Sequence, residues 1–178
     1  NLTPGLYSYS VSDQAGCTLT DSIEINSVEP LELIFTPTEP LCFGGETGSI
    51  ETEISGGLAP YEITWTGPDG FSASVDTLMN LVAGEYSLTV VDSVSCELGE
   101  TILLTQPEPL NLSLNSIDAT CVNVADGSID AVTTGGTSDY TYQWSGPDDF
   151  DSDLSEITAL LPGEYFLNVT DVNGCELA

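Results

Sequence analysis

The sequence of 178 residues contains no lysine, arginine or histidine, against 29 aspartates and glutamates, so its formal net charge is −29. Without basic side chains the chain cannot neutralise phosphates, which excludes nucleic-acid binding and polybasic contacts with a membrane surface. Neither a histidine base nor a lysine nucleophile is present for catalysis. Paired carboxylates alone can hydrolyse glycosides, but a repeating module with no other catalytic residue type is not expected to be an enzyme.

The sequence also lacks the features of a disordered or membrane-spanning chain. Leu, Ile, Val and Phe account for 48 of the 178 residues, which is about 27% and above the ~20% level below which disorder is expected. No apolar run approaches the ~18 residues that a spanning helix needs. Thr, Ser, Gly, Val and Tyr are plentiful, so the composition predicts a folded, β-rich protein.

An internal repeat organises the chain, with a period of seventy-nine positions. Without a gap, the segments 42–99 and 121–178 are identical at 22 of 58 positions. Residues 1–29 are therefore predicted to be the C-terminal part of one repeat, residues 30–108 a complete repeat, and residues 109–178 a repeat that lacks its last strand. Prolines at the junctions predict short, extended links between the repeats.

Within the complete repeat, apolar and polar side chains alternate with a period of two, as in Tyr61–Trp65 and Tyr86–Val90. Short alternating runs that are separated by glycine turns predict antiparallel strands, and about seven such strands predict an all-β, immunoglobulin-like sandwich. Tyr86 and Tyr165 are predicted to form tyrosine corners, in which the phenol bonds to nearby backbone. Trp65 and Trp144 occupy the place of the core tryptophan of strand C.

The cysteines also follow the period. Cys42 and Cys96 are separated by fifty-four positions, and Cys121 and Cys175 by the same interval. We place the A–B region and the F–G hairpin at the same end of a sandwich, and so predict the disulfides Cys42–Cys96 and Cys121–Cys175, with free buried thiols as the alternative. Metal ligation is disfavoured because no CxxC motif or histidine accompanies them. Cys17 is left unpaired, since at the same interval its partner would lie upstream of this sequence.

One acidic cluster suits calcium, which prefers oxygen ligands: Asp148, Asp149, Asp151 and Asp153. The alternative is a solvated acidic loop. The complete repeat does not share most of these carboxylates, although a site intrinsic to the module would be expected in both copies. No other cofactor is indicated.

Two sets of repeated residues have structural interpretations. Asp13, Asp92 and Asp171 each precede an F–G turn, where an aspartate that bonds its own backbone is favoured over a ligand role. The aromatic residues could form a carbohydrate platform, but their alternation along strands favours packing in the core. The aromatic set is Tyr61, Trp65, Tyr86, Tyr140, Tyr142, Trp144 and Tyr165.

Several stretches together resemble the SprB-type repeat, which occurs in tandem in giant surface adhesins of gliding Bacteroidota. They are CFGGETGSI at 42–50, WTGPDG at 65–70, LVAGEY at 81–86, Cys96, and Gln106-Pro107. The third repeat departs from this pattern at 122–124 and at Asp139. The resemblance implies type IX export, an extracellular position on a bacterial cell surface, and a role in gliding or adhesion.

The resemblance also makes one modification motif relevant, because Bacteroidota glycosylate exported proteins at Asp followed by Ser or Thr and then a small or apolar residue. Three acceptors fit, and we rank them Ser93, Ser22 and Thr77, with Thr77 last because it precedes an apolar stretch that we expect to be partly buried. The alternative is ordinary turn chemistry.

Taken together, the residues predict a tandem array of immunoglobulin-like repeats that serves as the stalk of a secreted adhesin or surface filament. Its partners would be the neighbouring repeats of the same chain, with a surface glycan or another adhesive ligand as a further partner. Two alternatives stay open: a carbohydrate- or calcium-binding module, and a subunit that self-assembles into an extracellular filament.

Overall fold

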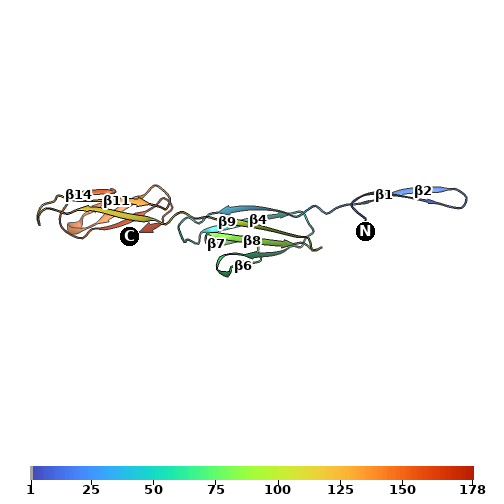
Figure 1. Cartoon of the computed structure of the whole chain (residues 1–178), viewed down its shortest axis with the longest axis horizontal. Coiled ribbons are helices and arrows are strands. Elements are labelled where there is room, and N and C mark those ends of the chain that lie inside the picture. Colours follow the sequence, from blue (N-terminus) through green and yellow to red (C-terminus); the bar gives the residue numbers. More distant parts are fainter. Residues whose placement is uncertain (1) are drawn as a thin grey trace.

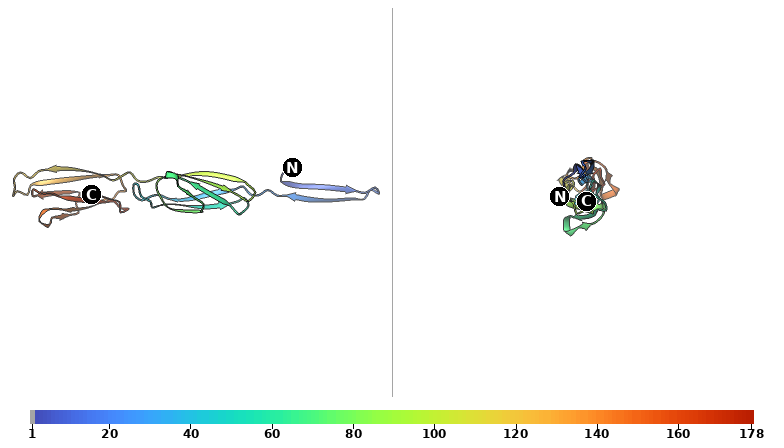
Figure 2. Two further views of the ribbon diagram at one scale, coloured as in Figure 1. Left: turned by 90° about the horizontal axis from the view of Figure 1, so that it is seen from below. Right: turned by 90° about the vertical axis from the view of Figure 1, so that its right-hand side faces the viewer.

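The computed structural model describes residues 2–178; residue 1, the first of the predicted 1–29 segment, lies outside the described residues. The chain is elongated, with a hairpin and two β-sandwiches arranged in a row (Figures 1 and 2). Apart from the 3-10 turns η1 (Pro68–Gly70) and η2 (Pro147–Asp149), all regular elements of residues 2–178 are strands. The predicted all-β class is confirmed.

The central sandwich consists of two antiparallel sheets whose strands lie within residues 32–104. One sheet has the order β3-β4-β7, with β3 (Glu32–Thr38), β4 (Gly48–Ser55) and β7 (Thr77–Leu81). The other has the order β6-β5-β8-β9, with β6 (Ser72–Ala73), β5 (Glu62–Thr66), β8 (Gly84–Val91) and β9 (Glu97–Leu104).

The second sandwich repeats this topology one period later. Its first sheet is β10 (Asn111–Ile117), β11 (Gly127–Thr134) and β14 (Glu156–Leu160). Its second sheet is β13 (Asp151–Ser152), β12 (Thr141–Ser145), β15 (Phe166–Thr170) and β16 (Glu176–Leu177). The N-terminal hairpin consists of β1 (Gly5–Ser12) and β2 (Thr18–Ile25), which lie one period before β8 and β9.

A buried tryptophan lies at the centre of each sandwich. The side chains of Trp65 and Trp144 are 0% and 1% exposed. Each indole nitrogen donates a hydrogen bond to a backbone carbonyl ten residues further on, that of Val75 at 3.1 Å and that of Leu154 at 2.9 Å. The indole polar group is therefore satisfied inside the core, which confirms the predicted strand-C position.

The tyrosine corner is present in all three segments. The phenol of Tyr86 donates to the carbonyl of Val82 at 3.1 Å, and that of Tyr165 to the carbonyl of Leu161 at 3.0 Å. The phenol of Tyr7 donates in the same way, over four residues, to the carbonyl of Thr3. Each corner fixes the chain where it enters its F strand.

The loops of a sandwich divide between its two ends. The A–B loop (39–47) lies at the end where Gly48 of β4 pairs with Leu81 of β7. The F–G turn (92–96) lies at the opposite end beside the B–C loop (56–61), where the amide of Ser93 donates to the carbonyl of Leu58 at 2.9 Å. Each A–B loop therefore points toward the following repeat, and each F–G turn points toward the preceding one.

Candidate functional site

The junction between the two sandwiches is closed by a disulfide that joins Cys42 of the A–B loop to Cys175 of the next repeat's F–G turn. The two Cα atoms are 5.6 Å apart, and the two residues are separated by 133 positions. The predicted pairs Cys42–Cys96 and Cys121–Cys175 are therefore wrong. Within residues 2–178, Cys17, Cys96 and Cys121 are free and exposed.

The error lay in placing the A–B loop and the F–G turn at the same end of one sandwich. The eight-residue strand β8 alone spans roughly 26 Å, whereas a disulfide requires Cα atoms within about 7 Å. Two cysteines separated by fifty-four positions thus lie at opposite ends of one repeat. Adding one repeat period to that interval gives the observed separation of 133, which joins the facing ends of two neighbours.

Three hydrogen bonds reinforce the junction around the disulfide. The side-chain oxygen of Gln106, in the link, accepts from the amide of Gly44 in the A–B loop at 2.7 Å. On the other side, the side-chain amide of Asn173 donates to the carbonyl of Leu41 at 3.3 Å and to the hydroxyl of Thr137 at 3.0 Å. The link and both facing loops are therefore tied to one another.

The link is also seated on the repeat that it enters. The amide of Gly136 donates to the carbonyl of Glu108 at 2.7 Å. A Cβ on Gly135, whose φ is +74°, would overlap the carbonyl oxygen of Pro109, so the close approach of the two backbones requires glycine. The same arrangement recurs one period earlier, where Gly56 faces Pro30.

A buried aspartate shapes the F–G turn that carries Cys175. One carboxylate oxygen of Asp171 accepts from the amides of Asn173 and Cys175, each at 2.9 Å. The other oxygen accepts from the amide of Thr137 in the B–C loop at 2.9 Å. Burial raises the pKa of Asp171, but the bonds from Thr137, Cys175 and other turn amides outweigh it, so the pKa lies below its usual value.

The equivalent aspartates also accept hydrogen bonds from the backbone amides of their turns, which confirms the predicted turn role. Asp92 accepts from the amides of Val94, Cys96 and Leu58 at 3.0, 2.7 and 3.0 Å. Asp13 accepts from the amides at 15 and 17, each at 2.9 Å. The bond to the B–C loop was not foreseen from the sequence, because a turn motif by itself does not reveal a partner 34 residues away.

The predicted calcium ligands do not converge. Asp148, Asp149, Asp151 and Asp153 are all exposed along η2, β13 and the residues that follow. Across the described residues 2–178, no group of three or more His, Cys, Asp or Glu side chains is placed to hold a metal ion.

The predicted glycan acceptors Ser93, Ser22 and Thr77 are all exposed. The apolar stretch that follows Thr77 is partly buried, as expected, because Leu78 and Leu81 lie in the core, whereas Thr77 itself is exposed. Whether any of the three carries a sugar stays a prediction.

The aromatic residues pack inward, as predicted. Trp65, Tyr86 and Trp144 are buried, and the other four pack against the two cores. The phenols of Tyr61 and Tyr140 donate to backbone carbonyls of the B–C loops, each at 2.6 Å. Their polar ends are thus occupied by the fold itself.

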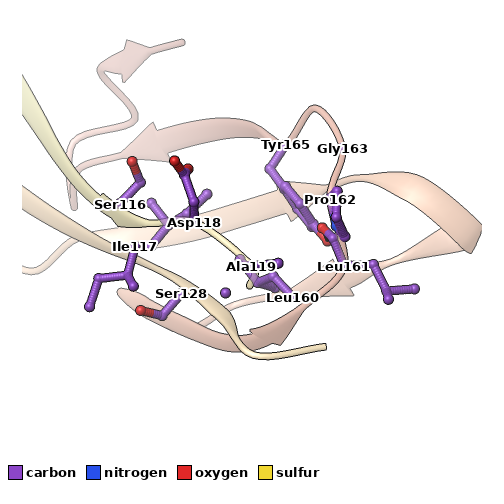
Figure 3. A pocket seen from close by; sticks show the side chains of 12 residues that line it. Ser116, Ile117, Asp118, Ala119, Ser128, Leu160, Leu161, Pro162, Gly163 and Tyr165 are labelled. Atoms are coloured by element: carbon purple, nitrogen blue, oxygen red, sulfur yellow. Dashed lines mark hydrogen bonds between the residues drawn. The ribbon is translucent and has the colours of Figure 1, made fainter. Parts of the chain in front are cut away.

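A cavity of about 370 Å³ opens at the end of the second sandwich, between the loop before β11 and the residues around Tyr165 (Figure 3). In the central sandwich the same place holds Leu104 of β9 and Pro40, which are both buried and lie against Gly48. The second sandwich has Ala119 in place of Pro40, and β16 pairs with β15 only at Glu176 and Leu177. The cavity therefore occupies the place that the end of β9 fills in the central sandwich, and we do not interpret it as a ligand site.

Over residues 2–178 we find no helix with the length and apolar character needed to cross a membrane.

The fold is shared with a solved structure, the N-terminal eight Ig domains of Down Syndrome Cell Adhesion Molecule (DSCAM) isoform 1.30.30. The TM-score is 0.51 at 16% sequence identity, and the likeness covers 98% of this chain. It spans only 27% of that structure, and at this identity it shows the immunoglobulin-like fold alone. No curated protein matches the sequence significantly. The SprB repeat family matches residues 34–70 and 113–149, two segments one period apart, which confirms the predicted resemblance to the SprB repeat.

Proposed function

We propose that the chain is part of the stalk of a cell-surface adhesin, in which immunoglobulin-like repeats are clamped end to end so that they hold a distal region away from the cell. The Cys42–Cys175 bridge carries this proposal. A disulfide inside each repeat would stabilise a domain, whereas a disulfide between repeats restrains the angle of one domain relative to the next.

The rest of the junction serves the same purpose. The link is held by hydrogen bonds to both repeats, through Gln106 on one side and Glu108 on the other. Twenty-nine carboxylates without a single basic residue repel one another within a screening length of roughly 8 Å, which opposes folding back of one repeat on another.

The surrounding biology is part of the proposal. Disulfides persist in oxidising, extracellular compartments, which fits a cell-surface location. The SprB resemblance supports surface anchoring and a role in adhesion or gliding, with no catalytic activity. Calcium at Asp148–Asp153 and glycans at Ser93, Ser22 and Thr77 are further hypotheses, testable by calorimetry and by intact mass of the secreted chain.

Small-angle X-ray scattering tests the clamp. The reference protein carries Cys17→Ser, Cys96→Ser and Cys121→Ser, which remove the free thiols and leave the bridge intact. The test protein adds Cys42→Ser and Cys175→Ser. At about 0.15 M salt we expect a broader distribution of interatomic distances and a smaller radius of gyration in the test protein, because hydrogen bonds of roughly 1 kcal/mol each would alone restrain the junction.

Circular dichroism should give the same spectrum for both proteins, since neither core contains the bridge. Superimposable scattering curves from two folded proteins would contradict the proposed clamp.

A further inference from the structure

We propose that Cys121 and Cys96 are the two complementary halves of the clamp seen between Cys42 and Cys175. Cys121 would bond to the F–G cysteine of a repeat that follows, and Cys96 to the A–B cysteine of a repeat that precedes. The proposal rests on the proposed stalk function and names its covalent partner, which is a further repeat of the same kind.

The free and the bonded F–G turns have the same backbone geometry. The amide of Cys96 donates to Asp92 at 2.7 Å, and the amide of Asp92 donates back to the carbonyl of Cys96 at 2.9 Å. The corresponding bonds between Cys175 and Asp171 measure 2.9 and 3.0 Å. The backbone turn that carries Cys175 in the bridge is therefore already formed around the free Cys96.

The free and the bonded A–B loops correspond in the same way. The amide of Gly45 donates to the carbonyl of Cys42 at 3.0 Å, and the amide of Val124 donates to the carbonyl of Cys121 at 3.1 Å. A second bond closes each loop, from the amide of Leu41 to Thr47 and from the amide of Thr120 to Asp126. Cys121 is thus held as Cys42 is, but its thiol is exposed.

No partner inside the described chain satisfies these thiols. Cys175 is already bonded to Cys42, and Cys96 lies at the end of its sandwich that faces away from repeat 109–178. The remaining free thiol, Cys17, lies in the turn of the β1–β2 hairpin, and the central sandwich separates that hairpin from Cys121 (Figure 1). The described residues also contain no metal cluster that would use them. A following repeat is the partner that presents an F–G cysteine to the Cys121 end in the observed geometry.

The bond needs an oxidant, for which a small-molecule disulfide such as oxidised glutathione suffices. The thiolate of Cys121 attacks one glutathione sulfur and releases the other as a thiolate. The F–G thiolate then attacks Cys121 sulfur and displaces the second glutathione. Two protons and two electrons leave the cysteine pair, and one disulfide is reduced to two thiols.

The test extends the chain by one period. A second copy of residues 100–178 is appended after Ala178, which is equivalent to Gly99, so that the register of the repeats continues. Cys17 and Cys96 are changed to Ser throughout. In the appended copy, Cys121→Ser removes a competing thiol, and Val172→Ile adds a mass label at a side chain that is 61% exposed.

The protein is refolded in a glutathione redox buffer, alkylated, and cut with a glutamate-specific protease, because trypsin has no lysine or arginine to cleave. We expect two linked peptide pairs, Cys42 with Cys175 and Cys121 with the mass-labelled copy of Cys175. In a matched protein whose appended copy carries Cys175→Ser, Cys121 should be alkylated in full.

The Cys42–Cys175 peptide in the same digest reports folding and the clamp itself. If it forms while Cys121 is alkylated or linked elsewhere, this inference is overturned and the proposed stalk function stands. If neither linked pair forms in a protein with the expected circular dichroism, both are overturned.

Discussion

The two sandwiches have the same topology but are sealed to different extents at the end that carries the A–B loop. In the central repeat, Ile50 and Tyr86 are 0% and 1% exposed. Their equivalents Ile129 and Tyr165 are only partly buried. The eight residues of β9 pair along the whole of β8, whereas the 178-residue sequence ends at the position equivalent to Gly99, so β16 has two residues and no counterpart of Leu104 is included. The last strand thus buries the side chains at the end that carries the A–B loop. The centre of the sandwich does not depend on it, because both tryptophans are equally buried there.

Leu104→Ala should remove most of this difference. Leu104 is 1% exposed and fills the place that is a cavity in the other sandwich. Truncating a buried leucine costs about 2–5 kcal/mol, so we expect the unfolding free energy of the central repeat to fall by that amount in urea titrations. Leu103→Ala, on the same strand but 60% exposed, is the control and should change it by less than about 0.5 kcal/mol. Equal losses for the two variants would show that β9 does not seal the core.

The two tyrosine corners also differ in burial, because the hydrogen bond of Tyr86 is partly buried and that of Tyr165 is exposed. Desolvation raises the pKa of the buried Tyr86 phenol, and the Asp69 carboxylate adds to the rise. Tyr86→Phe leaves the carbonyl of Val82 without its partner in a partly buried site, so we expect a loss of about 1 kcal/mol. Tyr165→Phe should cost less, because water can reach the carbonyl of Leu161. Hydrogen exchange of each repeat measures the two losses separately, and a larger loss for Tyr165→Phe would contradict this account.

The smallest predicted difference is in how the two A–B loops respond to acidic pH. The A–B loop of the second sandwich is closed by Asp126, which accepts from the hydroxyl and the amide of Thr120 at 2.6 and 2.8 Å. These bonds lower the pKa of Asp126, so their stabilisation is complete above the unfolded pKa near ~3.9 and is lost as pH falls through the lower folded value. The central repeat has Thr47 at this position, which does not titrate.

Below about pH 4, exchange of the Thr120 amide, corrected for its intrinsic rate, should therefore accelerate relative to that of Leu41. Asp126→Thr should abolish the difference between the two loops. An unchanged ratio of the two rates from pH 5 to pH 2.5 would contradict the assignment to Asp126.

The sequence sufficed for the repeat, the strands, the tyrosine corners and the core tryptophans, because each leaves a local or periodic trace. The disulfide partners did not follow, because spacing alone does not say at which end of a sandwich a loop lies. The alternation of strand directions between Cys42 and Cys96 contained that answer, and counting it would have placed the two residues at opposite ends. The bond from Asp92 to the B–C loop had no such trace, since it depends on how two distant loops meet.

The bridge has a consequence when the chain is pulled from its two ends. Tension that enters at Pro30 passes along β3 to Cys42, crosses to Cys175 and leaves through β16. Residues 43–174 then lie in a closed covalent loop beside the loaded path, so tension along the backbone does not have to pass through them. At roughly 3.4 Å per extended residue, about 450 Å of contour length is withheld from stretching. Two domains that would otherwise unravel one after the other become a tether of nearly fixed length.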